Sequence, residues 1–275
     1  MTRDDLPLGG RNAFQEHCRA SVSALYTGQG TLLCRVLGGA LCYVDAADVS
    51  VAPHLAMDGF WETWNSVALG RSVRRGWRVA DVGANHGCYT LLLAMLVGPE
   101  GHVTAIEPNP RLFQLLQRSV AANGLGDRVT LLPYAAASVN GDVELRVPRG
   151  SSGDGSLARR YSGELDTFRV PQRRLDEVIE GPLDFLKIDA EGADYDALMG
   201  ARGLLPSERP AAILLEHHAP FHASPIERLQ GLVADGFALA YVTDAGDVAP
   251  TSIAGIAEQP QRFWDLWLTR PGRTA

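Results

Sequence analysis

A short apolar run, a glycine turn and a long apolar segment constrain this chain more than any other feature. The run 79–82 is followed by the turn 83–87 and then by an apolar stretch that reaches Leu96. This pattern predicts a strand, a tight turn and a buried helix. Glycines let a ligand approach the backbone closely, and free N–H groups at the helix N-terminus favour an electronegative ligand. Such a unit opens a doubly wound α/β sheet, with the ligand beyond the first strand.

The spacing inside the turn argues against a dinucleotide. Three residues separate Gly83 from Gly87, so the middle glycine of G-x-G-x-x-G is missing. Asp81 stands two residues before Gly83, and the pattern resembles the first motif of class I methyltransferases, which bind S-adenosylmethionine (SAM). Backbone N–H groups at Ala84 and Asn85 suit the SAM carboxylate, and Asp81 could reach its amino group through a water or the backbone. The alternative is an ordinary turn that binds no nucleotide.

A second apolar run ends in Glu107. An acidic side chain at the end of the second strand can accept hydrogen bonds from both ribose hydroxyls. Pro108 and Asn109 would then lie beside the cofactor. Asn109 is also a good N-cap, with Pro110 as the first residue of a helix that ends at residues 123–124. The alternative for Glu107 is a solvated charge at the strand end.

Three more predicted strands end in polar or small residues. In an open α/β sheet the ligand lies beyond the carboxyl ends of the strands, so these ends share one crevice. We expect Tyr134 and Ala135 to lie over the adenine. The predicted strands and the residues that follow them are 128–132 with 134–136, 183–188 with 189–192, and 211–215 with 216–218.

The fourth strand of the predicted sheet, 183–188, carries the residues expected at the reaction centre. Lys187 is the only lysine of the chain and stands two residues before Asp189, so both side chains point to one face of the strand. Methyl transfer from a sulfonium is an in-line displacement that needs a positioned acceptor and a base for a hydroxyl proton. Histidine titrates nearest to neutral pH and is the natural base. The candidate bases are Asp189, Glu191, His217 and His218.

The carboxylates of the same crevice offer a second chemistry. Asp189 and Glu216, together with Glu191, could hold Mg²⁺, which would lower the pKa of the acceptor and orient it. Oxygen ligands suit Mg²⁺ or Ca²⁺ better than zinc. The alternative for the histidine pair 217–218 is a partly exposed strand end without a chemical role.

Residues 1–56 form a separate unit in this interpretation, before a sheet domain over 57–275. We expect a helical arm over 12–26, a hairpin of strands 32–36 and 41–44, and a third short strand at 49–51. The arm covers the active site, contacts a second subunit in a homodimer, or packs on its own domain, and the sequence leaves all three arrangements open. A helix over 57–69 carries Trp61 and Trp64, which line a pocket or belong to the core.

Three predictions concern the later segments. The exposed strand 142–147 is expected to pair with residues 135–139 around a turn at 140–141. The Gly- and Ser-rich segment 149–163 reads as a flexible loop, either a lid or a plain insertion. Ser224 and Glu227 predict a capping box for the helix that follows.

Charge and composition exclude several classes of function. The chain of 275 residues has 25 basic and 32 acidic residues, and its net charge of −7 argues against a general nucleic-acid surface. Because no apolar run can span a bilayer and no signal peptide is evident, we expect no membrane contact. Four cysteines without metal-like spacing suggest reduced thiols in the cytoplasm. A small molecule is the expected acceptor.

Three segments together resemble the FkbM family of methyltransferases. They are 79–90, 106–110 and 186–192, and the last, Leu-Lys-Ile-Asp-Ala-Glu-Gly, is the most specific. The resemblance implies methyl transfer from SAM, usually to oxygen, in the tailoring of polyketides, sugars or other secondary metabolites such as antibiotics. His86 stands where the family often has an apolar residue. By match to the motifs, the resemblance places Asp81, Gly83, Asn85, Gly87 and Glu107 at the cofactor and Lys187, Asp189 and Glu191 at the active site.

The expected fold is therefore a Rossmann-like, doubly wound class I methyltransferase sheet of the α/β class. It is mostly parallel, with an antiparallel C-terminal strand over 263–268 and an N-terminal helix and hairpin. The expected function is SAM-dependent methylation of a small-molecule hydroxyl. The competing hypotheses are methylation of a small-molecule amine and a non-catalytic SAM-binding role in a biosynthetic complex.

Overall fold

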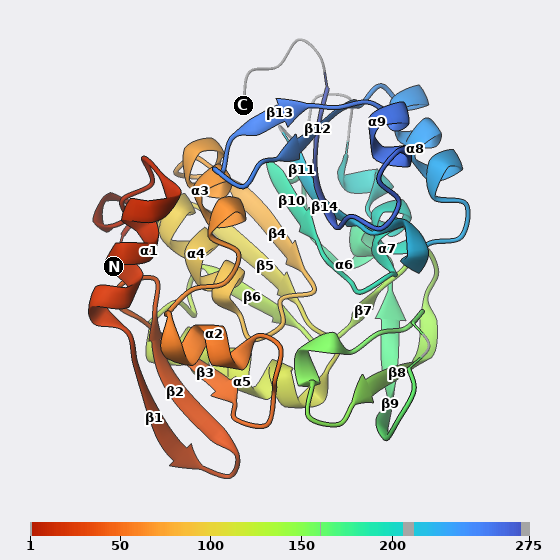
Figure 1. Cartoon of the computed structure of the whole chain (residues 1–275). Helices are drawn as coiled ribbons and strands as arrows, with labels where there is room; N and C mark the ends of the chain where they lie inside the picture. Colours follow the sequence, from red (N-terminus) through yellow and green to blue (C-terminus); the bar gives the residue numbers. More distant parts are fainter. Residues whose placement is uncertain (1, 160, 206–211, 271–275) are drawn as a thin grey trace.

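The computed structural model describes residues 2–159, 161–205 and 212–270 and is built around one eight-stranded sheet (Figure 1). Apolar runs with turns at both ends give its strands, as the sequence predicts. In spatial order they are β13 (Val248–Pro250), β12 (Ala238–Val242), β14 (Trp264–Thr269), β11 (Ala212–His217), β10 (Phe185–Ile188), β4 (Arg78–Val82), β5 (His102–Ile106) and β6 (Val129–Leu132).

The strand directions define where a ligand can bind. β11, β10, β4, β5 and β6 are parallel to one another, whereas β14 runs antiparallel to β11 and β12. The chain leaves β4 toward β5 on one side, and β10 later joins β4 on the other side. This reversal creates a crevice at the carboxyl ends of β4 and β10, as in other doubly wound sheets. The mostly parallel sheet with an antiparallel C-terminal strand confirms the predicted fold.

Helices cover both faces of the sheet because alternate strand residues are apolar on both faces. Val79 and Phe185 face one core, whereas Ala80 and Leu186 face the other. The first face is covered by α3 (Thr63–Ser72), α4 (Cys88–Val97) and α5 (Pro110–Ala122), and the second by α6 (Leu175–Val178), α7 (Asp194–Gly200), α8 (Pro225–Ala234) and α9 (Ile253–Ala257).

The N-terminal unit differs from its prediction. The predicted arm helix over 12–26 is only α1 (Arg11–Ser21), because residues 23–28 pair with β2 and this pairing overrides the helical periodicity. Of the helix predicted over 57–69, residues 63–69 lie in α3, whereas Met57 is the last residue of α2. Gly59, with a φ of 77°, separates the two helices. The unit contains η1 (Arg3–Asp5), α1, β1 (Ser23–Gly28), β2 (Thr31–Val36), β3 (Ala40–Asp45) and α2 (Ala52–Met57), and residues 49–51 form no strand.

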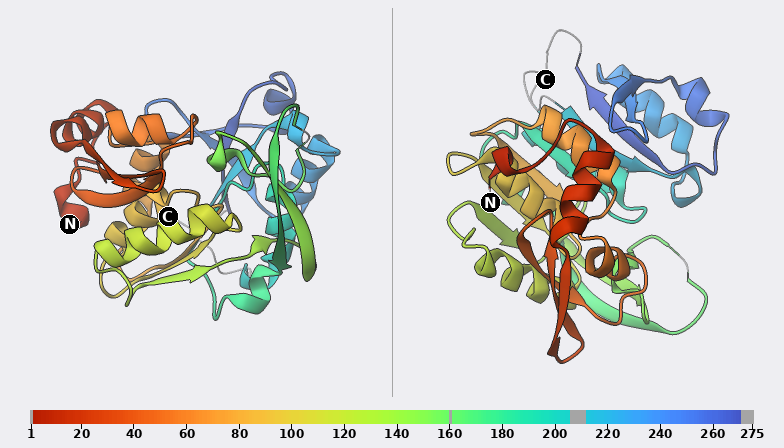
Figure 2. Two further views of the ribbon diagram at one scale, coloured as in Figure 1. Left: turned by 90° about the horizontal axis from the view of Figure 1, so that it is seen from below. Right: turned by 60° about the vertical axis from the view of Figure 1, so that its left-hand side comes forward.

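This N-terminal unit is packed onto the sheet domain. Its three strands form a separate layer beside the central sheet (Figure 2). Phe14 and Val36 belong to the same hydrophobic core as Leu92 and Val103. The two parts therefore share one hydrophobic core. The boundary proposed at residue 56 falls inside α2.

A third sheet stands on the other side of the crevice. The strand predicted over 142–147 is β8 (Gly141–Pro148), but it pairs with β9 (Leu165–Arg173) along its whole length rather than with 135–139. β7 (Ala135–Ala136) pairs with the opposite edge of β9, so β9 lies between the two. The segment joining β8 and β9 contains the short helix η2 (Ser152–Asp154).

The helix ends are partly as predicted. The side chain of Asn109 accepts a hydrogen bond from the backbone of Arg111, which confirms the N-cap of α5. Ser224 forms no side-chain cap, since its φ of 52° turns it away and Pro225 begins the helix.

The short helices η3 (Arg202–Leu204) and η4 (Ala219–Phe221) follow α7 and β11. Residue 211, the predicted start of β11, lies outside the described residues. Among the helices within the described ranges, none has the length and apolarity to cross a membrane.

Candidate active site

The turn after β4 depends on its glycines. A Cβ on Gly83 would lie 1.7 Å from the carbonyl oxygen of Asp189, and Gly83 has a φ of 75°. A Cβ on Gly87, with a φ of 91°, would lie 2.4 Å from Cδ1 of Leu116. Only glycine adopts these conformations without a side-chain collision. The turn therefore brings the exits of β4 and β10 into direct contact.

Asp81 and Lys187 form a buried ion pair below this turn. They stand opposite each other in the register of β4 and β10. Lys187 Nζ lies 3.3 Å from Asp81 Oδ1 and 3.5 Å from Asp189 Oδ2, and Asp81 also accepts a 2.6 Å hydrogen bond from Thr90. Burial alone would lower the pKa of Lys187, but the surrounding carboxylates outweigh it and raise the pKa. Asp81 is completely buried, so the structure shows it supporting the turn from below.

Glu107 is held by the backbone on both sides. Its two carboxylate oxygens accept 2.7 Å hydrogen bonds from the N–H groups of Asn85 and Asn109. Burial raises the pKa of Glu107 to about 7, although these two bonds oppose the shift. The carboxylate is therefore fixed at the end of β5, where a ribose would be expected.

A narrow cleft opens at these strand ends, with about 50 Å³ of free volume. Seven of the predicted cofactor residues line it: Gly83, Asn85, Glu107, Pro108, Asn109, Tyr134 and Ala135. Among the predicted catalytic residues, Asp189 and Glu191 also line it. Of the other three predicted cofactor residues, Ala84 lines the adjoining cavity, whereas Asp81 and Gly87 line neither.

The segment 151–155 covers this cleft, and we refer to it as the strap. Asn85 Nδ2 and Asn109 Nδ2 donate to the carbonyls of Gly153 and Ser152 at 3.1 and 3.0 Å. Asp48 Oδ2 accepts from Gly153 N at 2.7 Å. Three hydrogen bonds therefore hold Ser152 and Gly153 of the predicted flexible loop 149–163 in place. Arg160 lies outside the described residues.

A second, smaller cavity of about 30 Å³ adjoins the cleft. The two share Gly83, Asn85 and Asp189. Ala84, which does not line the cleft, lines this cavity. The aromatic rings of Trp61 and Tyr89 are part of its wall, whereas the neighbouring Trp64 donates to Asp265 Oδ2 at 2.8 Å. The remaining lining residues are Val51, His86, Cys88 and Lys187.

Two acids near this cavity were missed by the sequence interpretation. Glu62 accepts a 2.7 Å hydrogen bond from the hydroxyl of Tyr89, and burial together with Asp265 and Asp189 raises its pKa to about 8. Asp265 stands opposite Glu216 in the register of β14 and β11. The sequence offered no recurrent motif for either acid, since Glu62 precedes the part of the chain that carries the family motifs.

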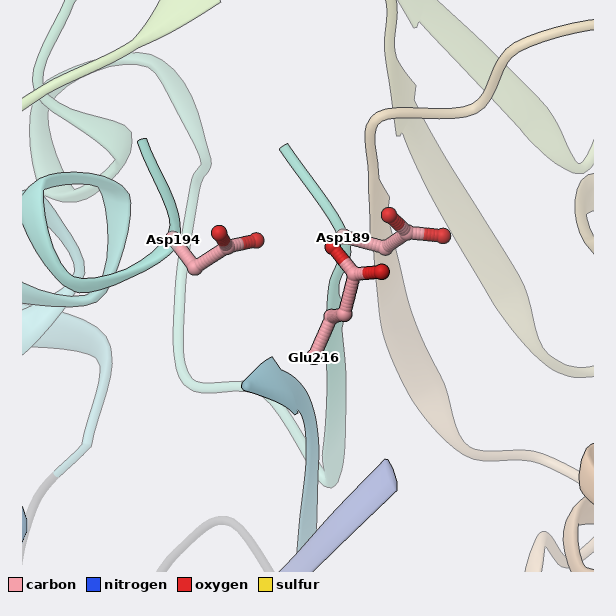
Figure 3. A group of neighbouring side chains, drawn as sticks. All are labelled: Asp189, Asp194 and Glu216. Atoms are coloured by element: carbon pink, nitrogen blue, oxygen red, sulfur yellow. The ribbon is translucent and has the colours of Figure 1, made fainter. Parts of the chain in front are cut away.

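The structure changes one member of the predicted carboxylate set: Asp194 lies beside Asp189 and Glu216, and Glu191 does not. Glu191 forms an ion pair with Arg159, with both side chains about one quarter exposed. One oxygen each of Asp189, Asp194 and Glu216 lies within 4.8 Å of the others. Figure 3 shows the carboxyl group of Asp194 turned toward those of Asp189 and Glu216.

The structure is not consistent with His217 as the base. Its side chain is completely buried, and its Nδ1 lies 2.8 Å from the hydroxyl of Tyr195 in α7. Successive strand residues point to opposite faces, so Glu216 reaches the crevice and His217 enters the core below it. Burial lowers the pKa of His217 to about 4. His218, stacked 3.9 Å from the ring of Phe263, lines neither cavity.

The sheet topology, the glycine turn and the strand-end carboxylates define a class I methyltransferase. The chain belongs to the FkbM methyltransferase family, because the model of the methyltransferase FkbM domain matches residues 81–248, more than half of the chain. The predicted family is confirmed. The family is defined by a methyltransferase domain, and the acceptor is a separate question.

Curated relatives with other names share parts of the sequence. Ribosomal RNA small subunit methyltransferase G of Mycobacterium sp. (strain KMS) is 33% identical over 162 residues, which cover 57% of this chain and 61% of that protein. Protein-L-isoaspartate O-methyltransferase of Ignicoccus hospitalis is 42% identical over 60 residues, 22% of this chain and 28% of that protein. The chain therefore spans less than two thirds of each of these relatives.

A solved structure of the same family is also similar. Methyltransferase FkbM from Methylobacillus flagellatus KT is 18% identical, and the alignment covers 75% of this chain and 52% of that one with a TM-score of 0.44. Residues of the present chain fit SAM on their own geometry. Glu107 is fixed at the end of β5, where a ribose is expected, and carboxylates of the crevice suit the positive charge of a sulfonium.

Proposed function

We propose that this methyltransferase transfers the methyl group of SAM to a hydroxyl of a small molecule, such as a secondary metabolite. The observation that carries the proposal is the cavity beside the cofactor cleft, which Asp189 lines together with the cleft. The rings of Trp61 and Tyr89 in its wall suit a partly apolar group, and this cavity of about 30 Å³ would have to widen to admit one.

The proposed reaction assigns a role to each nearby residue. The acceptor oxygen attacks the methyl carbon, the new O–C bond forms as the C–S bond breaks, and the electron pair of the C–S bond goes to sulfur. The hydroxyl proton goes to a carboxylate oxygen of Asp189, and Lys187 holds that carboxylate from 3.5 Å. Asp81, Ala84 and Gly87 would support the turn that receives the methionine end of SAM. Mg²⁺ near Asp189 and Glu216 is included in the proposal, since it would orient the acceptor oxygen.

The remaining expectations fit this proposal. Residues 1–56 would help to select the acceptor, because Val51 lines the second cavity. A homodimer through this unit stays a prediction, for which exposed Leu25 and Tyr26 on β1 offer an apolar surface. A cytoplasmic location also stays a prediction.

RNA is the second candidate acceptor, because relatives carry ribosomal RNA methyltransferase names. The net charge of −7 disfavours it, since RNA binding needs cationic side chains along the phosphates. A small-molecule amine is a third candidate acceptor, and a non-catalytic SAM-binding role would require no acceptor at all.

The test is methyl transfer from isotopically labelled SAM to three pools: hydroxyl-bearing small molecules, small-molecule amines, and ribosomal RNA with ribosomal subunits. The proposal expects product in the first pool. Asp189→Asn should reduce turnover by about 10²-fold or more while S-adenosylhomocysteine still binds. Glu100→Gln is the control, because Glu100 is exposed between α4 and β5, at the amino ends of the strands. Label found only in RNA or only in amines would contradict the proposal, and binding without transfer to any pool would favour a non-catalytic role.

A further inference from the structure

Three carboxyl groups meet where β10 and β11 end. One oxygen each of Asp189, Asp194 and Glu216 lies within 4.8 Å of the other two (Figure 3). Oxygens bound to one small divalent cation at about 2.1 Å lie roughly 3–4.2 Å apart. A small adjustment of side chains would therefore place all three around one ion.

Lys187 is the basic side chain that pairs with this group among the described residues, and it serves two carboxylates. Lys187 is shared between Asp81 at 3.3 Å and Asp189 at 3.5 Å, while Arg159 pairs with Glu191. Oε2 of Glu216 is buried and has no hydrogen-bond partner among the described residues. Carboxylates packed together away from water need a proton or a cation between them. The two oxygens of Asp194 accept hydrogen bonds from the N–H groups of Ala190 and Gly192 at 2.6 and 3.0 Å, which leaves a lone pair free on each.

A histidine outside the carboxyl group points to a cation rather than to a proton. The side chain of His222 is 4% exposed, and its Nε2 lies 3.9 Å from Oδ2 of Asp194. This Nε2 has no hydrogen-bond partner in the described part of the chain.

The Nε2 of His222 can face Asp194 either with an N–H or with a lone pair. A lone pair directed at a carboxylate is repulsive unless a cation lies between the two groups, and a neutral imidazole nitrogen is a common metal ligand.

We propose that this group binds one divalent cation of the oxygen-preferring class, Mg²⁺ or Mn²⁺. Carboxylates suit these ions, and an added imidazole favours Mn²⁺ over Mg²⁺. Its ligands are Asp189, Asp194, Glu216 and His222. Asp194 replaces Glu191 of the sequence-based set, and His222 was absent from that set. Because Asp189 also lines both cavities, the ion lies at the edge of the crevice. A contact with the acceptor oxygen would rest on the proposed function.

The experiment is a titration of EDTA-treated, dialysed full-length protein with Mn²⁺, followed by the electron paramagnetic resonance of free Mn²⁺. The expected result is one Mn²⁺ per chain that Mg²⁺ displaces at higher concentration. Glu216→Gln should weaken Mn²⁺ binding at least tenfold. Glu100→Gln is the matched control, because it removes an exposed carboxyl at the opposite ends of the strands, and it should bind Mn²⁺ like the natural sequence. Absent stoichiometric binding, or equal affinity in Glu216→Gln, overturns the proposal.

Two further measurements keep the test decisive. Circular dichroism checks that each variant folds; if Glu216→Gln does not, His222→Gln decides, because the nitrogen coupling in the electron spin-echo spectrum of bound Mn²⁺ should disappear. A persistent coupling would remove His222 from the site. S-adenosylhomocysteine is added to the same samples in a thermal shift assay. Stabilisation by this ligand without Mn²⁺ binding rejects only the cation site, whereas Mn²⁺ binding without stabilisation rejects only the proposed function.

Discussion

Glu107 and Glu216 end two strands on opposite sides of the switch point, and their surroundings differ. Both oxygens of Glu107 accept backbone N–H groups. An oxygen of Glu216 is buried without a hydrogen-bond partner among the described residues. Burial raises the pKa of both carboxyls. The half of the crevice at β4 and β5 is therefore complete within the chain, whereas the half at β10 and β11 has polar atoms that need a partner.

The largest effect should come from the turn that joins the two halves. Gly83→Ala would place a Cβ 1.7 Å from the carbonyl oxygen of Asp189, so we expect a loss of about 4 kcal/mol or more in the free energy of unfolding. Gly76→Ala is the control, because Gly76 has a similar φ of 78° with nothing within 4 Å, and it should cost roughly 1 kcal/mol. Urea denaturation measures both. Equal losses would show that the contact between the two halves is unimportant.

The comparison itself is tested by the same change at both glutamates. Glu107→Gln replaces an acceptor oxygen by an NH₂ group that faces a backbone N–H, at a cost of about 1.5–3 kcal/mol. S-adenosylhomocysteine should then bind roughly 10- to 100-fold more weakly by calorimetry. Glu216→Gln in metal-free protein should leave the melting temperature unchanged or raise it, since it removes a repelling charge. A lower melting temperature for Glu216→Gln would mean that its carboxylate already has a stabilising partner.

The acids of the crevice also predict an unusual pH dependence. Burial raises the pKa of Glu62 and Glu191 to about 8 and that of Glu107 to about 7. The folded protein therefore holds protons that the unfolded chain has lost above about pH 4.5, and this stability disappears as the pH rises to 8. Three histidines whose pKa values burial lowers to about 4 act oppositely, but only below about pH 6.5.

Between pH 6.5 and 8 the acids alone change protonation. The free energy of unfolding of metal-free protein should fall over this interval, by at most about 1.4 kcal/mol per pH unit for each carboxyl. Urea denaturation at about pH 6.5, 7.2 and 8 measures the slope, which Glu62→Gln should reduce. A free energy that rises with pH over this interval would contradict the raised pKa values.

The smallest effect is expected at His217, which is buried in the core. Tyr195→Phe removes the hydroxyl that lies 2.8 Å from Nδ1 of His217 and should cost about 1 kcal/mol of stability. Affinity for S-adenosylhomocysteine should stay unchanged by calorimetry. Reduced affinity would return His217 to the candidate site.

The cofactor half was predictable because its determinants are local in the sequence. Gly83, Gly87 and Glu107 stand directly after apolar runs, and strand-end geometry converts that order into position. Strand alternation also separates Glu216 from His217, and applying it there would have removed His217 from the candidate bases. The arm helix was predicted too long because pairing between β1 and β2 is not encoded in periodicity.

The rest of the site depends on contacts between distant segments. Glu62 approaches Tyr89 only after the N-terminal unit packs on the sheet, and His222 approaches Asp194 through the chain after β11. Neither pair has a fixed spacing that marks it. The position of β9 between β7 and β8 likewise reflects a partner far along the chain from β7, which a local hairpin signal does not reveal.

The hydrogen bonds of the strap bear on how fast a ligand can enter and leave the cleft. Gly153 is tied through its N–H to Asp48 of the N-terminal unit and through its carbonyl to Asn85 of the turn. We expect SAM to break these bonds on entry and S-adenosylhomocysteine to break them again on departure. Opening of the strap would then limit release of the product cofactor, as lid opening limits turnover in many enzymes.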